Sequence, residues 1–143
     1  MADATSSDAL QLSPYIFFYG RCEEALEFYK KALGGSYDLQ RVEGTPGADE
    51  LPAEARNRVM HATFTAPGIS FMASDGQETK TIDPDAGNIN LCLGTKDRAR
   101  GERTFNALAD GGKTLQPFGE AFWGGMFGAA VDRFGIEWMV TTA

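Results

Sequence analysis

The chain contains a single histidine, His61. The reactions in which it could take part depend on which other side chains act with its imidazole. Histidine changes charge near neutral pH and serves as a general base or as a metal ligand. Glu137 and Asn90 could join His61 around a divalent metal, but this is a weak ligand set for zinc or iron. Two enzymatic alternatives follow: a metal-dependent enzyme with an atypical site, or a metal-free enzyme that uses His61 as base.

Aromatic and apolar residues suggest a third possibility, the binding of an organic molecule. Tyr15 and Phe17 are two residues apart in a β-rich run, so their side chains share one face of a strand. In an enclosed cavity such side chains fit a planar or apolar ligand, and Glu137 could hold a cationic group. The alternative for each aromatic residue is packing in the core. For Glu137 the alternative is a charge at the rim of the cavity. The predicted ligand-binding residues are Tyr15, Phe17, His61, Asn90, Trp123, Phe127, Glu137 and Met139.

The two cysteines, Cys22 and Cys92, are far apart and form no Cys-x-x-Cys motif. This usage fits a reducing compartment, so we expect a cytoplasmic protein. Cys22 stands beside Arg21 at the start of a predicted helix, where a thiolate would be stabilised, and a reactive thiol is one hypothesis. Cys92 is expected to be a small buried residue on a strand.

Composition excludes several classes of function. The 143 residues include 13 basic and 20 acidic side chains, and the net charge of −7 disfavours nucleic acid as a partner. No stretch approaches the roughly 18 apolar residues of a membrane span. The first dozen residues are small and polar and lack the pattern of a signal peptide.

An internal repeat organises the chain. The block 28–35 aligns with 105–112, and both end in Gly-Gly; the block 68–74 aligns with 135–141, and both begin Gly-Ile. The first half carries extra residues between its two blocks, which we assign to a loop beginning at Glu43 because of its Pro, Gly and acidic residues.

Each half has the same pattern of elements, a strand, a helix and three strands. We predict a single domain, 1–143, with a first βαβββ repeat at 13–74, a linker at 75–87 and a second repeat at 88–143. The expected fold class is α+β, with a curved, mostly antiparallel mixed sheet around a cavity. In the first half the predicted helix is 22–33 and the strands are 14–19, 36–43, 58–66 and 69–73. In the second half Asp97 is the expected N-cap of a helix ending at Ala109, and the strands are 89–93, 113–118, 126–132 and 136–141.

Several motifs in this order resemble the PhnB-like branch of the vicinal-oxygen-chelate (glyoxalase/bleomycin-resistance) superfamily, which is also labelled 3-demethylubiquinone-9 3-methyltransferase-like. They are 14–20, 24–29 with Gly34-Gly35, Met60-His61-Ala62, Phe122-Trp123-Gly124 with Phe127-Gly128, and 132–138. The methyltransferase label would imply a glycine-rich turn between a strand and a helix. The glycines at 124–128 instead precede a predicted strand, so we treat that label as misleading.

The resemblance also implies where a metal would bind in enzymatic members. The corresponding positions here are occupied by Pro14 or Tyr15, Met72, Asn90 and Met139, and none of them keeps a normal ligand. We therefore expect no metal and no cofactor, and favour a metal-free binding protein for a small aromatic or cationic molecule. Dimerisation is common in this fold class, which predicts a homodimer, with the repeats pairing either within one chain or across two.

Overall fold

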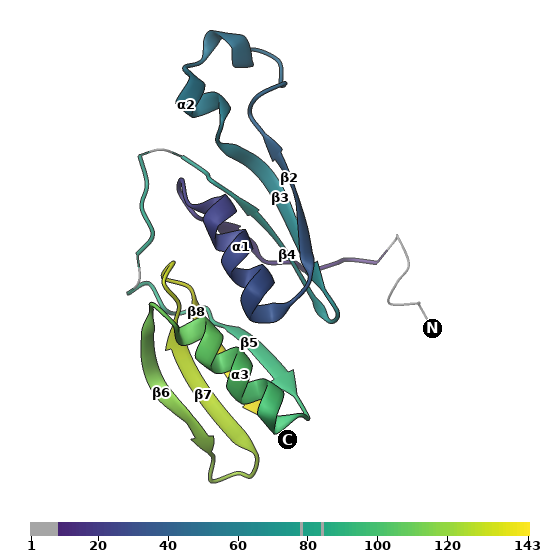
Figure 1. Cartoon of the computed structure of the whole chain (residues 1–143), viewed down its shortest axis with the longest axis vertical. Coiled ribbons are helices and arrows are strands. Elements are labelled where there is room, and N and C mark those ends of the chain that lie inside the picture. Colours follow the sequence, from purple (N-terminus) through teal and green to yellow (C-terminus); the bar gives the residue numbers. More distant parts are fainter. Residues whose placement is uncertain (1–8, 78, 84) are drawn as a thin grey trace.

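The computed structural model describes residues 9–77, 79–83 and 85–143, in which the chain forms two similar units joined end to end (Figure 1). The first unit consists of β1 (Tyr15–Phe17), α1 (Cys22–Leu33), β2 (Ser36–Arg41), β3 (Val59–Ala66) and β4 (Ile69–Ser74). The second consists of β5 (Leu91–Thr95), α3 (Arg98–Ala109), β6 (Lys113–Glu120), β7 (Met126–Val131) and β8 (Glu137–Thr142). A 3-10 helix, η1 (Ala48–Glu50), and α2 (Ala53–Arg56) lie between β2 and β3.

The strand order is the same in both units, which confirms the predicted pair of βαβββ repeats. The first sheet has the order β1-β4-β3-β2 and the second β5-β8-β7-β6. In each sheet the first strand is parallel to the last, and the remaining pairs are antiparallel. Within the described ranges, no strand of one sheet is hydrogen-bonded to a strand of the other, so the mixed sheet is divided into two.

Both long helices follow from local sequence. In α1 an apolar stripe buries Leu26 and Tyr29, acidic residues occupy the first turn and lysines the last, as the helix dipole favours. The predicted N-cap of α3 is confirmed, since the Asp97 side chain accepts a hydrogen bond of 3.1 Å from the Arg100 backbone N–H.

The repeated Gly-Gly at the helix ends has a steric origin. A Cβ atom added at Gly35 would lie 2.4 Å from the backbone oxygen of Thr65, and one added at Gly112 would lie 2.1 Å from that of Val131. In both repeats the second glycine therefore lets the chain leave the helix against the neighbouring strand.

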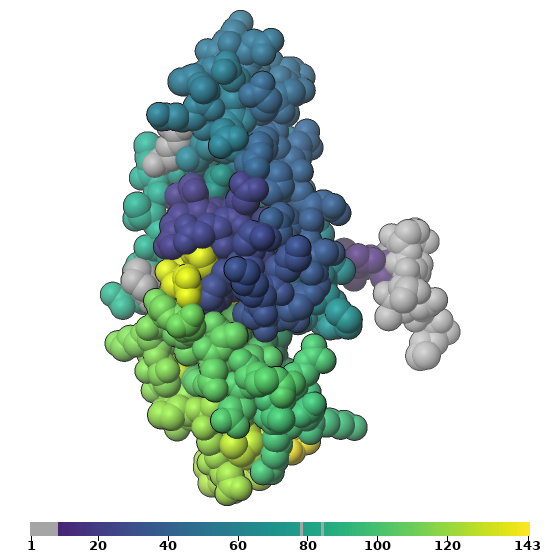
Figure 2. Space-filling view, in the orientation of Figure 1, coloured from purple at the N-terminus to yellow at the C-terminus, as the bar shows by residue number. Residues whose placement is uncertain are grey.

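The core runs continuously from one unit to the other. Tyr29 of α1 packs against Phe71 of β4 and Trp138 of β8, with ring centroids 5.7 and 5.6 Å apart. Phe71 and Trp138 occupy equivalent positions in the two repeats, so one tyrosine joins both sheets. Figure 2 shows the turn before β8 in yellow, against the purple residues of α1.

Each sheet is covered by its helix on one face only. Phe64, Phe71 and Trp138 point towards the helices and are buried. The side chains at the alternate positions of the strands point away from the helices. Among them, Tyr15 and Phe17 are 41% and 47% exposed. We call these uncovered surfaces the first and second open faces.

Most predicted elements are observed, with shifted ends. Asn90 was expected inside a strand but lies just before β5, and the predicted loop after Glu43 contains η1 and α2. The predicted buried position of Cys92 is wrong, because this residue is exposed on the second open face. The proposed polar leader lies mostly in 1–8, outside the described residues, as do positions 78 and 84 of the predicted linker. Among the helices in the described ranges, none combines the length and the hydrophobicity of a membrane-spanning segment.

Candidate functional site

The predicted ligand-binding residues divide between two surfaces. Residues of β1 and β3 lie on the first open face, and residues at or near β8 lie on the second. The first group is Tyr15, Phe17 and His61, and the second is Asn90, Trp123, Phe127, Glu137 and Met139. One chain therefore does not bring all eight residues together.

The first open face carries an aromatic cluster with one polar pair. The Tyr15 hydroxyl and His61 Nδ1 lie 3.2 Å apart, within hydrogen-bond distance. The Tyr15 ring lies against Phe17, with centroids 5.1 Å apart, and its strand partner in the sheet is Met72. The imidazole thus lies beside one aromatic ring, with centroids 5.6 Å apart, and its orientation is fixed by the hydroxyl of that ring.

A groove of about 830 Å³ begins on the second open face and extends under the linker that joins the repeats. Glu137 lines the groove, and its Oε2 atom is buried without a hydrogen-bond partner among the described residues. The linker backbone lies close above it, since a Cβ atom at Gly87 would be 3.2 Å from that oxygen. Asn90 donates to the Gly87 carbonyl at 3.4 Å, so it holds this linker segment rather than a ligand.

Of the residues that line this groove, the sequence identified only Glu137 as a site residue, and those it missed include Lys113 and Val131. Register places Lys113 opposite Val131, and Val131 opposite Glu137, so the three form one row across β6, β7 and β8. The strand pairing that creates this row depends on irregular register in β6, and no pattern in the sequence indicates it.

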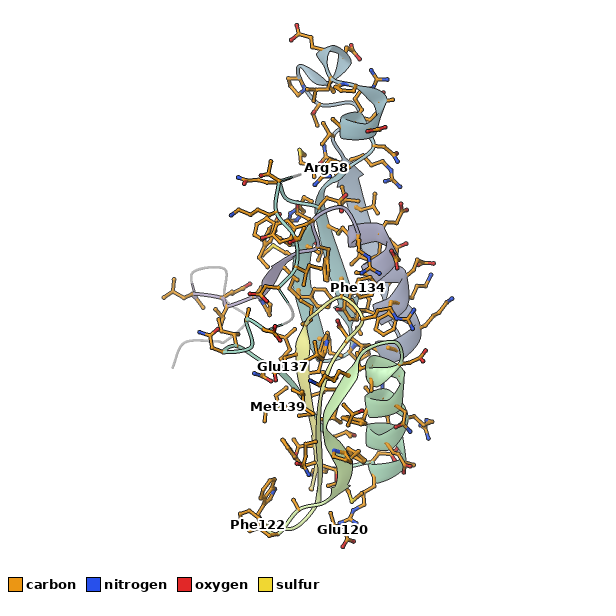
Figure 3. All side chains as sticks on the ribbon, turned by 90° about the vertical axis from the view of Figure 1, so that its left-hand side faces the viewer. Arg58, Glu120, Phe122, Phe134, Glu137 and Met139 are labelled. Carbon is orange, nitrogen blue, oxygen red and sulfur yellow. The ribbon has the colours of Figure 1, made fainter. Side chains whose placement is uncertain are left out.

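Trp123 and Phe127 lie at the other end of the second sheet. Their rings are 5.6 Å apart, and Trp123 also packs edge-on against Phe122, which is 98% exposed. Figure 3 shows Phe122 at the hairpin tip, far from Glu137, with Met139 between them along β8. Trp123 and Tyr15 therefore do not share a cavity mouth within one chain.

A buried carboxylate, Asp132, joins the two repeats beside the groove. It accepts hydrogen bonds from the Tyr29 hydroxyl at 2.5 Å and from the Trp138 indole N–H at 2.8 Å. The backbone N–H groups of Phe134 and Ile136 donate to its other oxygen. Burial raises the pKa of Asp132, and burial with the adjacent carboxylate raises the pKa of Tyr29 well above its ordinary value. All these donors are protein groups, which indicates a structural role.

Cys22 is not the reactive thiol that its position beside Arg21 suggested. It is fully buried, and burial, with Asp75 and Glu23 nearby, raises the pKa of the thiol to about 12. Arg21 instead pairs with Glu24 at 2.8 Å and stacks on Phe134.

The donor set does not fit a metal within one chain. His61 lies on the first sheet and Glu137 on the second. Across the described ranges, no three His, Cys, Asp or Glu side chains are grouped so that they could hold a metal ion. The tight metal sites of proteins need three or four such ligands.

The glycines at 124–128 also do not fit the usual site for S-adenosylmethionine. Gly124 and Gly125 form the turn between antiparallel strands β6 and β7, with a hydrogen bond from Gly124 N–H to the Ala121 carbonyl. The usual nucleotide-type site needs a glycine-rich turn from a parallel strand into a helix.

Comparison with solved structures identifies the class of fold. A glyoxylase/bleomycin resistance protein/dioxygenase domain from Frankia sp. EAN1pec aligns with a TM-score of 0.61 at 17% identity, over 95% of this chain and 93% of that one. The chain thus has the glyoxalase/bleomycin-resistance fold.

The family follows from a closer match. The family model described as 3-demethylubiquinone-9 3-methyltransferase matches residues 10–141, and the chain belongs to this PhnB-like family.

Individual relatives support this assignment. Protein PA1353 from Pseudomonas aeruginosa is 36% identical, with a TM-score of 0.79 over 94% of this chain and 98% of that one. A PhnB protein from Bacillus cereus is 26% identical, with a TM-score of 0.73 over 94% and 100%. Protein YjdN from Escherichia coli (strain K12) is 29% identical over 92% of this chain and 94% of its own.

Proposed function

We propose that the chain binds a small organic molecule through a cationic group, without a metal, in the groove that contains Glu137. The observation that carries this proposal is the buried, unpaired Oε2 atom of Glu137. A carboxylate oxygen removed from water without a donor is costly. A ligand N–H group that displaced the linker at Gly87, which covers this oxygen, would supply the missing hydrogen bond.

The remaining walls of the groove suit the carbon skeleton of such a ligand. Ile82, Leu115, Val131 and Phe134 line it alongside Glu137. Leu115 is 43% exposed, a large fraction for an apolar side chain on a sheet. Contact with a ligand would remove this apolar surface from water and add to the affinity.

The test is the binding of phenethylammonium, which carries one aromatic ring and one ammonium group. Isothermal titration calorimetry on chelator-treated protein should detect binding, and E137Q should weaken it by at least about tenfold. E102Q is the matched control, because Glu102 is exposed on α3 and outside the groove. Equal affinity in wild type and E137Q would contradict the proposal.

A second candidate function rests on the Tyr15–His61 pair. In the tautomer in which His61 Nδ1–H donates to the Tyr15 hydroxyl oxygen at 3.2 Å, Nε2 carries no proton and can remove one from a substrate on the first open face. This would be a metal-free enzyme with His61 as general base. Retention of full turnover in H61A, once a substrate is found, would eliminate it.

We also propose that a second copy of the chain covers the open faces. Tyr15 and Phe17 are too exposed for an isolated sheet surface, and residues predicted to share a site are divided between the two sheets. A homodimer could place the first open face of one copy against the second open face of the other. The two free thiols fit the cytoplasmic location expected from the sequence.

A further inference from the structure

The groove that contains Glu137 also has a positively charged side chain, Lys113, on its opposite side. Lys113 lines the groove on β6, and its side chain is exposed. Its partner in the sheet is Val131, whose other partner is Glu137. Directly paired residues of antiparallel strands point to the same face, so all three side chains rise from one floor.

The spacing of this row is set by the sheet. Neighbouring strands lie about 4.8 Å apart, so the Cα atoms of Lys113 and Glu137 are about 10 Å apart. No ion pair within 4.0 Å links the two side chains in the described structure. An ammonium and a carboxylate thus stand at either end of an apolar floor formed by Val131.

The other charged side chains of the groove are already paired with groups of the protein or lie at the edge of the groove. Arg21 is paired with Glu24, and Arg133 with Asp110 at 3.0 Å. Asp132 is saturated by protein donors. Asp85, on the linker, is exposed and adds negative charge on the side of Glu137.

From this arrangement we infer that the ligand is an amino carboxylate whose charged ends are separated by several carbon atoms. Its ammonium group binds Glu137, its carboxylate binds Lys113, and its carbon chain lies over Val131 and Leu115. This inference rests on the proposed function and makes it more specific, because a ligand with an ammonium group alone would leave Lys113 without a role.

The experiment compares three probes of equal chain length, 6-aminohexanoate, hexylammonium and hexanoate, by isothermal titration calorimetry. We expect 6-aminohexanoate to bind about fivefold more tightly than hexylammonium, as an exposed ion pair allows. K113M should reduce its affinity to that of hexylammonium and leave hexylammonium binding unchanged. E137Q should weaken both. K96M and E102Q, exposed positions outside the groove, should change neither.

The outcomes separate the two claims. If hexylammonium binds as tightly as 6-aminohexanoate and K113M has no effect, the assignment of the ligand as an amino carboxylate is wrong. The proposed cation site at Glu137 is then not contradicted. If hexanoate binds most tightly, or if no probe binds, the cation site itself is wrong. Circular dichroism spectra of the variants establish that each one is folded.

Discussion

At the scale of single residues, Tyr29 and Asp132 have the greatest structural consequence, because their hydrogen bond joins the two repeats. Y29F removes the hydroxyl and leaves a buried carboxylate, 3% exposed as a residue, with one donor fewer. We expect the free energy of unfolding to fall by about 1–3 kcal/mol, as measured by urea denaturation. Y19F is the control, and an equal loss in both variants would show that the bond contributes little.

Cys22 gives a prediction for alkaline pH. Its thiol has a pKa of about 12 in the folded chain, against an ordinary value of 9.0. A pKa raised by folding means that stability is full at lower pH and is lost as pH rises from the unfolded value towards the folded one. Between about pH 9 and pH 10 the free energy of unfolding should therefore decrease, with a slope approaching about 1.4 kcal/mol per pH unit.

Substitution tests the origin of this slope. C22A should flatten it, whereas C92A, at the exposed cysteine, should leave it unchanged. Urea denaturation at a series of pH values measures the slope directly. An unchanged slope in C22A would assign the alkaline loss to other groups.

At the scale of elements, the Gly-Gly helix ends determine how each helix returns to its sheet. In G112A the new Cβ atom would overlap the Val131 backbone oxygen, which cannot move without disturbing β7. We expect a loss of about 2 kcal/mol or more in the free energy of unfolding. G119A is the matched control on β6, where an added Cβ meets no atom within 4 Å. Similar stability of the two variants would disprove the steric explanation.

The local sequence predicted the helices and strands better than it predicted which of their faces are buried and how the strands are paired. The helix at 22–33 and the Asp97 cap follow from periodicity and capping chemistry, which depend on neighbouring residues. The burial of Cys92 was mispredicted because alternation along a strand does not say which face the helix covers. The row from Lys113 to Glu137 depends on register across three strands, which only the folded sheet defines.

At the scale of the whole molecule, the division of the strands into two sheets leaves both open faces uncovered in one chain. If a second copy covers them, light scattering should give twice the chain mass of 15.4 kDa. F17D should shift the protein towards the monomer, because it places a charge in the aromatic cluster of the first open face. A wild-type protein that remains monomeric at high concentration would refute the proposed dimer.

The central claim is that the groove at Glu137 binds its ligand without a metal. It is tested most directly by the thermal unfolding of the protein with phenethylammonium, in EDTA and in zinc chloride. A ligand that binds only the folded state raises the melting temperature by mass action. We predict the same increase in both conditions, and its loss in E137Q. An increase that occurs only with zinc would contradict the claim.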